Sequence, residues 1–223
     1  MEGDVAGMTS VLAADGREVI GFVEYRQRRK GDLLDTRRVT RFRDGSSDED
    51  YAVARVVDGT LEGLHGRAII RDADGEELLD WHIDVPGGRV HGFVLDGDER
   101  QHFDERVDLP TATYWGPLIF IVLKNFEENA VDDRLIFRTV APTPMPRAID
   151  LELVREGAAR VTRTGGDLET IRFTLRPSIH WLVDPIVQRI APTSEFFVRS
   201  SSPPALARFV GPRNYGGQKV VIE

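Results

Sequence analysis

Histidines and aspartates gather in one stretch of the sequence, where they could bind a metal ion or act in acid–base chemistry. They are Asp80, His82, Asp84, His91, His102 and Asp104. Imidazole nitrogens and carboxylate oxygens are common protein ligands of zinc and non-haem iron. If residues 86–89 and 96–97 form turns between strands, residue 84 faces residue 91 and residue 91 faces residue 102. This register predicts a metal site made by Asp84, His91 and His102 on three neighbouring strands.

The same residues also fit the solvated face of an antiparallel sheet, and this is the interpretation that we favour. Apolar residues at positions 81, 83 and 85 alternate with polar residues at positions 80, 82 and 84. Such alternation is typical of a strand with one buried and one solvated face. A shift of one residue in either turn would break the row of ligands, and the sequence has no HExxH-like motif. The metal-binding or enzymatic β domain is therefore our alternative hypothesis.

Several other kinds of chemistry lack the residues that they need. The chain has no cysteine, which excludes disulfides, thiolate zinc sites, iron–sulfur clusters and cysteine nucleophiles. It has no Gly-x-Ser-x-Gly nucleophile elbow and no phosphate-binding P-loop. We therefore assign no catalytic residue, expect no cofactor and favour a binding role over an enzymatic one.

Charge and hydropathy restrict the partners and the location of the protein. With 37 acidic and 29 basic residues the formal charge is −8, and a negative surface repels the phosphates of nucleic acid. The longest apolar run, residues 117–123, is far shorter than the roughly 20 residues that span a bilayer, so we expect no transmembrane segment. Residues 1–10 do not resemble a secretory signal. The sequence as written predicts a cytoplasmic location, and a periplasmic one if a signal peptide has been removed.

Most of the chain has the pattern of an antiparallel β protein. Short segments rich in Val, Ile, Phe, Tyr and Thr are separated by turn signals such as Asp58-Gly59 and Gly87-Gly88. We expect one domain, residues 1–223, in which the first 10–16 residues need not be ordered. The predicted strands are 18–28, 33–43, 51–57, 60–71, 76–85, 89–95, 134–140, 148–154, 159–164, 168–176, 195–199, 206–210 and 219–222. The predicted fold is mainly β, with a curved antiparallel sheet or open half-barrel.

One segment, residues 114–129, has helical rather than strand spacing. Its apolar residues on a helical pattern are Trp115, Leu118, Ile119, Val122, Leu123 and Phe126. Phe120 and Ile121 make this segment apolar on every side, so a helix here must be buried. Residues 178–191 contain a second apolar segment, in which Pro185 permits a short helix to begin. We expect one or two short apolar helices packed in the concave face of the sheet.

The order of these elements resembles an uncharacterised bacterial β-rich family, the DUF3108 type. The resemblance rests on the apolar segment 186–191, on Phe196-Phe197-Val198, Pro203-Pro204 and Gly211, and on residues 206–209 and 220–222. That family looks like a relative of the lipoprotein carriers LolA and LolB. Their fold is an open, strongly curved half-barrel whose cavity is lidded by helices and receives acyl chains. The resemblance implies a LolA-like fold and an apolar-ligand pocket between sheet and helix, and it transfers no catalytic residue.

Aromatic residues at the start of both apolar segments could line the mouth of such a pocket, or they could fill large gaps in the core. The pocket residues that we predict are Tyr114, Trp115, Leu118, Ile119, Val122, Phe126 and Trp181. Our first hypothesis is a non-enzymatic binding or carrier module for a lipid-like or other apolar ligand. A third possibility is a protein-interaction scaffold whose sheet edges pair with a partner. The sequence does not identify the ligand, the protein partner or the oligomeric state.

Overall fold

The strands of the first half of the chain follow one another as neighbours in a single sheet. A computed structural model describes residues 3–126, 131–141, 146–163, 166–178, 193–199, 201, 204–214 and 217–223. Short connections place consecutive strands side by side and antiparallel. These strands are β1 (Val5–Leu12), β2 (Val19–Lys30), β3 (Leu33–Phe42), β4 (Ser47–Val57), β5 (Thr60–Arg71), β6 (Glu77–Asp84), β7 (Arg89–Asp96) and β8 (Glu99–Arg106).

The second half of the chain forms another meander, which joins the first through the two terminal strands. Val11 in β1 pairs with Ile222 in the last strand, so the 14-stranded sheet has β8 at one edge and β9 at the other. The strands of this half are β9 (Arg134–Ala141), β10 (Arg147–Arg163), β11 (Gly166–Pro177), β12 (Ser194–Arg199), β13 (Ala205–Pro212) and β14 (Lys219–Ile222). The sheet is not closed, which confirms the predicted mainly β, open antiparallel fold.

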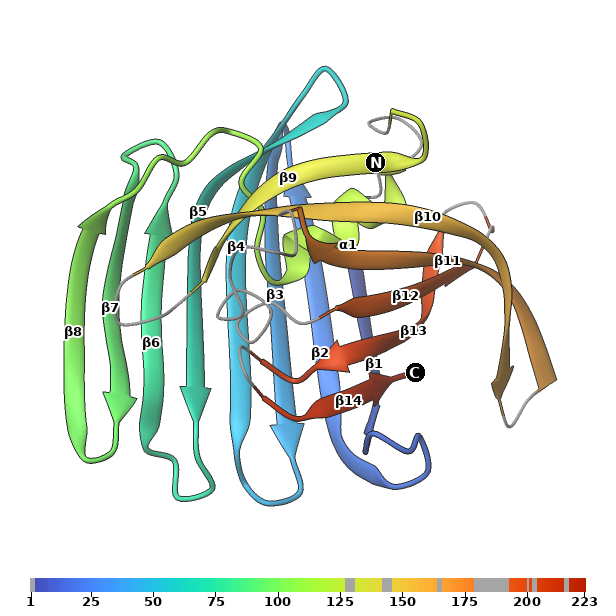
Figure 1. Cartoon of the computed structure of the whole chain (residues 1–223), viewed down its shortest axis with the longest axis horizontal. Helices are drawn as coiled ribbons and strands as arrows, with labels where there is room; N and C mark the ends of the chain where they lie inside the picture. Colours follow the sequence, from blue (N-terminus) through green and yellow to red (C-terminus); the bar gives the residue numbers. More distant parts are fainter. Residues whose placement is uncertain are drawn as a thin grey trace.

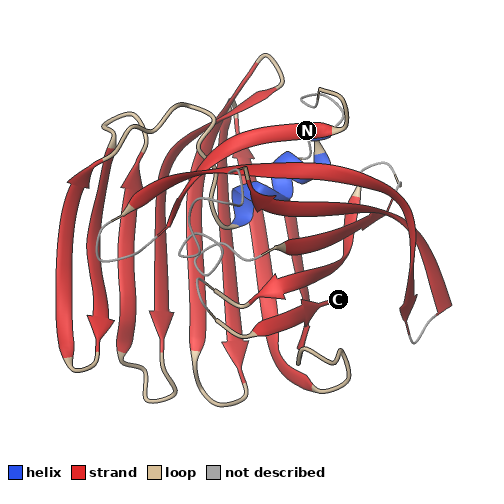
Figure 2. Cartoon of the chain, viewed as in Figure 1, coloured by secondary structure: helices blue, strands red, loops and turns tan. Residues whose placement is uncertain are grey.

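The single helix of the described residues belongs to the connection between the two edges of the sheet. The chain leaves β8 at residue 106 and must reach β9 at residue 134, and α1 (Pro117–Lys124) lies on that path. Figure 1 shows β9 to β11 crossing over the strands of the first half, with α1 between the two layers. Figure 2 shows the same arrangement by secondary structure. The helix contacts β3 and β4 on one side, so the prediction of an apolar helix in the concave face is confirmed.

Helix α1 is shorter than the segment that its spacing predicted. Gly116 has a φ of 47°, a left-handed conformation that favours glycine and that stops the helix from extending toward Trp115. Pro117 occupies the first turn, where its missing N–H costs no hydrogen bond. Leu118 is fully buried, and its burial anchors the helix in the core. The second predicted helix, which begins near Pro185 in the segment 178–191, lies outside the described residues. Within the described part of the chain, no helix is long and apolar enough to span a membrane.

Three strand predictions were wrong. Residues 5–12, which we allowed to be disordered, form β1, because pairing with β2 on one side and β14 on the other supplies two hydrogen-bond ladders. Strand β8 was not predicted, because most of its residues are charged. It is an edge strand in which only Phe103 is buried. The predicted break in residues 155–158 is instead a β-bulge within β10.

The indole of Trp115 packs against the backbone of β5. A Cβ atom at Gly66 would lie 2.0 Å from Trp115 Nε1, and one at Gly63 would lie 3.3 Å from Trp115 Cζ3. The residues paired with these glycines across β4 are Ala52 and Ala54, both fully buried. Trp115 Nε1 lies 3.4 Å from the carbonyl oxygen of Tyr51. Small residues on two strands thus leave a slot that fixes the start of the α1 segment.

We expect Gly66→Ala to destabilise the protein, because the new methyl group would overlap the indole ring of Trp115. Overpacking of this kind costs about 3 kcal/mol, which corresponds to roughly 6–12 °C in Tm for a chain of this length. Gly7→Ala is the matched control, since Gly7 is an exposed residue of β1 and a Cβ there meets no atom within 4 Å. Thermal unfolding followed by circular dichroism compares the two variants. Equal Tm values would contradict the packing of Trp115 on β5.

Candidate functional site

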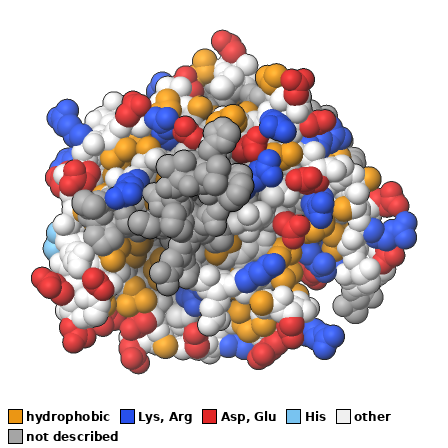
Figure 3. All heavy atoms as spheres, in the orientation of Figure 1, with side chains coloured by type: hydrophobic (Ala, Val, Ile, Leu, Met, Phe, Trp, Pro, Cys, Tyr) orange, Lys and Arg blue, Asp and Glu red, His pale blue; other side chains and the backbone are white. Residues whose placement is uncertain are grey.

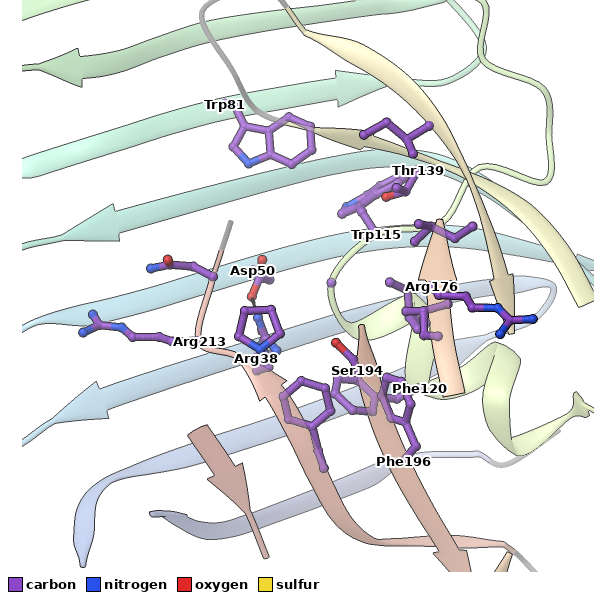
Figure 4. A pocket seen from close by; sticks show the side chains of 18 residues that line it. Arg38, Asp50, Trp81, Trp115, Phe120, Thr139, Arg176, Ser194, Phe196 and Arg213 are labelled. Atoms are coloured by element: carbon purple, nitrogen blue, oxygen red, sulfur yellow. Dashed lines mark hydrogen bonds and ion pairs between the residues drawn. The ribbon is translucent and has the colours of Figure 1, made fainter. Parts of the chain in front are cut away.

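A cavity of about 150 Å³ lies between α1 and the two halves of the sheet. Its wall is formed by side chains from β3, β4, β6, α1, β9 to β13 and the residues next to them (Figure 4). Most of these side chains are aromatic or aliphatic: Trp81, Trp115, Ile119, Phe120, Ile149, Leu151, Leu175, Phe196, Phe209 and Pro212. The cavity therefore offers a mainly apolar environment.

The aromatic part of the wall links α1 to the second half of the sheet. The Phe120 ring packs edge-on against Phe196 in β12 at 5.8 Å and against Phe209 in β13 at 6.2 Å between centroids. Phe196 and Phe209 are themselves 5.1 Å apart. Such aromatic clusters add about 0.5–1.5 kcal/mol per pair beyond their buried area. They hold the cavity wall in a fixed shape.

The arginines at the cavity are paired with carboxylates. Nε of Arg38 donates a hydrogen bond to Oδ2 of Asp50 at 2.8 Å, and these two side chains lie on neighbouring β3 and β4. Nε of Arg176 in β11 donates to Oε2 of Glu152 at 3.0 Å. Figure 4 shows Arg38 and Asp50 together at the cavity. A ligand therefore meets ion pairs rather than single charges here.

Arg213, which follows β13, ties the second half of the sheet to the first. Its Nε and Nη2 atoms donate to the two carboxylate oxygens of Asp48 in β4, both at 3.1 Å. Its guanidinium also lies 3.6 Å above the centroid of the Phe42 ring. Asp48 is only 4% exposed. Burial raises the pKa of the Asp48 carboxyl, while the hydrogen bonds and the charge of Arg213 oppose that rise.

Two buried polar atoms in the cavity wall stand out. Trp81, in β6, is 1% exposed, and Thr139, in β9, is 2% exposed. Among the described residues, neither Nε1 of Trp81 nor Oγ1 of Thr139 has a hydrogen-bond partner. Buried polar groups are nearly always hydrogen-bonded, so each exception needs an explanation.

The structure separates the pocket residues that we predicted. Trp115 and Ile119 line this cavity, whereas Tyr114 and Val122 line a second cavity of about 160 Å³ between α1, β5 and β9. The hydroxyl of Tyr114 donates to the carbonyl of Leu61, and burial raises its pKa to about 12. The remaining predictions are placed as follows: Leu118 and Phe126 are buried in the core without lining either cavity, and Trp181 lies outside the described residues.

Sequence reasoning missed most of the cavity wall. The alternation in residues 80–85 placed Trp81 on the buried face, and Trp81 is indeed buried. Nothing in the pattern showed that β6 faces β9 to β13, because that contact depends on how the second half of the sheet folds over the first. The sequence around Arg213 does not indicate that it lines a cavity, since its partner Asp48 lies 165 residues away in the chain.

The predicted metal site does not form, because the register of both hairpins differs from our expectation. Asp84 pairs with Arg89 rather than His91, and His91 pairs with His82 and Asp104 rather than His102. Each turn lies one residue away from its assumed position, which displaces the pairing by two residues. The polar face of these strands is otherwise as expected, with residues 81 and 83 buried and residues 80, 82 and 84 partly exposed.

The side chains of this region have other contacts. The rings of His82 and His91 stack with centroids 4.9 Å apart, and the Asp104 carboxylate accepts a hydrogen bond from Nε of Arg89 at 2.7 Å. In the part of the chain that the structure describes, no three side chains of His, Asp or Glu come together as a metal site. On the face seen in Figure 3, basic and acidic side chains are interspersed.

Comparison with known proteins gives a likeness of fold alone. No protein-family model matches the sequence, and no curated protein matches it. Among solved structures, the chain is similar to a β-barrel-like protein of a domain of unknown function, DUF1849, from Brucella abortus, with a TM-score of 0.51 and 10% identity. The alignment covers 99% of this chain and 94% of that one. The resemblance to the DUF3108 type and to LolA and LolB stays a prediction.

We expect Arg213→Met to destabilise the protein at pH 7 by about 3 kcal/mol, because it leaves the Asp48 carboxylate buried without its main partner. The pKa of Asp48 is already raised in the folded protein and should rise further in this variant. Proton binding by Asp48 then stabilises the fold below its unfolded pKa, and this stabilisation is lost as pH rises through the folded pKa. The cost of Arg213→Met should therefore shrink as pH falls toward 4, as measured by urea unfolding.

Asp48→Asn provides the control for this experiment. In the Asp48→Asn background, Arg213→Met no longer leaves a buried charge without a partner. The loss in free energy of unfolding should then be smaller and should not depend on pH. The same cost in both backgrounds would show that Arg213 acts through packing on Phe42 and not through Asp48.

Proposed function

We propose that this protein is a non-enzymatic binding module for a lipid-like or other small apolar molecule, which occupies the cavity beside α1. The observation that carries the proposal is the composition of the cavity wall, where aromatic and aliphatic side chains from both halves of the sheet converge. Ligand sites are mostly apolar concavities with a few polar groups that orient the ligand. The wall of this cavity fits that description.

The size of the cavity supports a small ligand, or one end of a longer one. An apolar protein cavity of about 150 Å³ binds benzene or xenon, and the cavity beside α1 has the same volume. Sites for drug-sized ligands are about 300–1,000 Å³. A ring or a short chain thus matches the space between the described residues better than a whole lipid does.

The electrostatics support a ligand whose buried part carries no charge. Arg38 and Arg213 each have a carboxylate partner, Asp50 and Asp48. An ion entering the cavity would have to give up its hydration without gaining an unpaired counterion, which costs several kcal/mol. An apolar or neutral group enters without that cost.

The other two hypotheses have less support. The metal-binding or enzymatic domain rested on a register that the structure does not have. The protein-interaction scaffold rests on the edge strands β8 and β9, of which β9 already pairs with residues 112–114, and it stays a prediction.

Filling the cavity tests the proposed function. We expect Ile119→Trp to weaken binding of toluene at least tenfold, because the larger side chain takes the space that the ligand needs. Phe22→Trp is the matched control, since Phe22 is 47% exposed and lines neither of the two cavities next to α1. Titration followed by NMR chemical shifts measures both affinities, and circular dichroism confirms that both variants fold. Absence of toluene binding to the wild type, or equal binding to the two variants, would contradict the proposal.

A further inference from the structure

We infer that the cavity beside α1 recognises an uncharged carbonyl group, such as that of an ester or ketone, carried on an apolar body. The inference rests on the proposed function and specifies the chemical class of the ligand. Its basis is the pair of buried polar atoms in the wall, Nε1 of Trp81 and Oγ1 of Thr139, which have no hydrogen-bond partner among the described residues.

The two atoms define what the ligand must offer. The indole N–H of Trp81 can only donate a hydrogen bond, and the hydroxyl of Thr139 can donate as well as accept. A carbonyl oxygen has two lone pairs and can accept from one or both of them. A saturated or aromatic hydrocarbon would leave both groups unsatisfied.

The two side chains line the same cavity, so a ligand there can contact either of them. Trp81 comes from β6 and Thr139 from β9, so they belong to the two opposing halves of the sheet. In Figure 4 both lie at the end of the cavity where Trp115 is found. Rotation about the Cα–Cβ bond of Thr139 exchanges its methyl and hydroxyl groups, so this residue can present either one to the cavity.

A neutral acceptor fits this end of the cavity better than a carboxylate. Arg38, Arg176 and Arg213 are the cationic side chains of the wall. Each has a carboxylate partner. A ligand carboxylate would compete with these partners, whereas a carbonyl oxygen can accept from Trp81 Nε1 or Thr139 Oγ1, which have no partner among the described residues. The charge pattern thus favours an ester or ketone.

The test uses three probes of nearly the same shape. Acetophenone carries a carbonyl group, α-methylstyrene replaces the C=O by C=CH₂, and benzoate replaces the methyl group by a charged oxygen. The measured quantity is the ratio of the two dissociation constants, acetophenone over α-methylstyrene, from NMR titrations of the full chain. This ratio cancels the general apolar contribution that the proposed function supplies.

We expect Thr139→Val to raise that ratio about tenfold, since a hydrogen bond of ordinary strength is lost for one probe only. Thr139→Ser, which keeps the hydroxyl, should leave the ratio near the wild-type value. Trp81→Phe, which keeps an aromatic ring without the N–H, should also raise it. Benzoate should bind at least tenfold more weakly than acetophenone to the wild type.

The outcomes separate the two proposals. If neither acetophenone nor α-methylstyrene binds, the proposed function itself fails. If both bind and the ratio is the same in the wild type, Thr139→Val and Trp81→Phe, the cavity binds apolar molecules without recognising a carbonyl, and this inference is overturned. Tighter binding of benzoate than of acetophenone would likewise overturn it.

A stability measurement without ligand gives an independent check. Because the hydroxyl of Thr139 has no partner among the described residues, Thr139→Val should leave the Tm of the free protein unchanged or raise it. A Tm several degrees lower would show that the hydroxyl is already hydrogen-bonded in the free protein, which would contradict the basis of the inference.

Discussion

The architecture depends on the burial of one apolar connection. The chain must cross from edge strand β8 to the opposite edge strand β9. The helix on that path carries apolar side chains on all of its sides. Each buried Leu, Ile, Val or Phe contributes about 1.5–3 kcal/mol, so the helix is stable only if both halves of the sheet enclose it. Leu118 is buried completely, and Phe120 contacts β12 and β13. The curvature of the sheet follows from this requirement.

The same connection produces the cavity. Trp115 is fixed in a slot whose floor is Gly66 on β5, and Phe120 is fixed by Phe196 and Phe209. Rings held in place before α1 and in its middle cannot collapse into the space between them. The protein thereby retains an unfilled volume and two polar atoms, Trp81 Nε1 and Thr139 Oγ1, that have no hydrogen-bond partner in the described part of the chain. Such groups cost about 1–3 kcal/mol each, and local departures of this kind are concentrated at functional sites.

Sequence patterns predicted what depends on neighbours along the chain. Turn signals and alternation gave the mainly β fold and most of the strands, and the apolar run around Leu118 gave the buried helix. Features set by contacts between distant segments were not predictable in this way. The pairing of β1 with β14 joins the two ends of the chain, and the Arg213–Asp48 pair joins residues 165 apart. The row of Asp84, His91 and His102 failed because register depends on the placement of each turn to a single residue.

The proposed function depends on a preformed apolar cavity between α1 and the two halves of the sheet. A crystal structure of the protein under xenon pressure tests it most directly, because xenon enters preformed apolar cavities of about this size without needing specific contacts. We expect a xenon atom bounded by Trp115, Phe120 and Phe196, with no displacement of α1. A structure in which these side chains meet one another and xenon binds only elsewhere would contradict it.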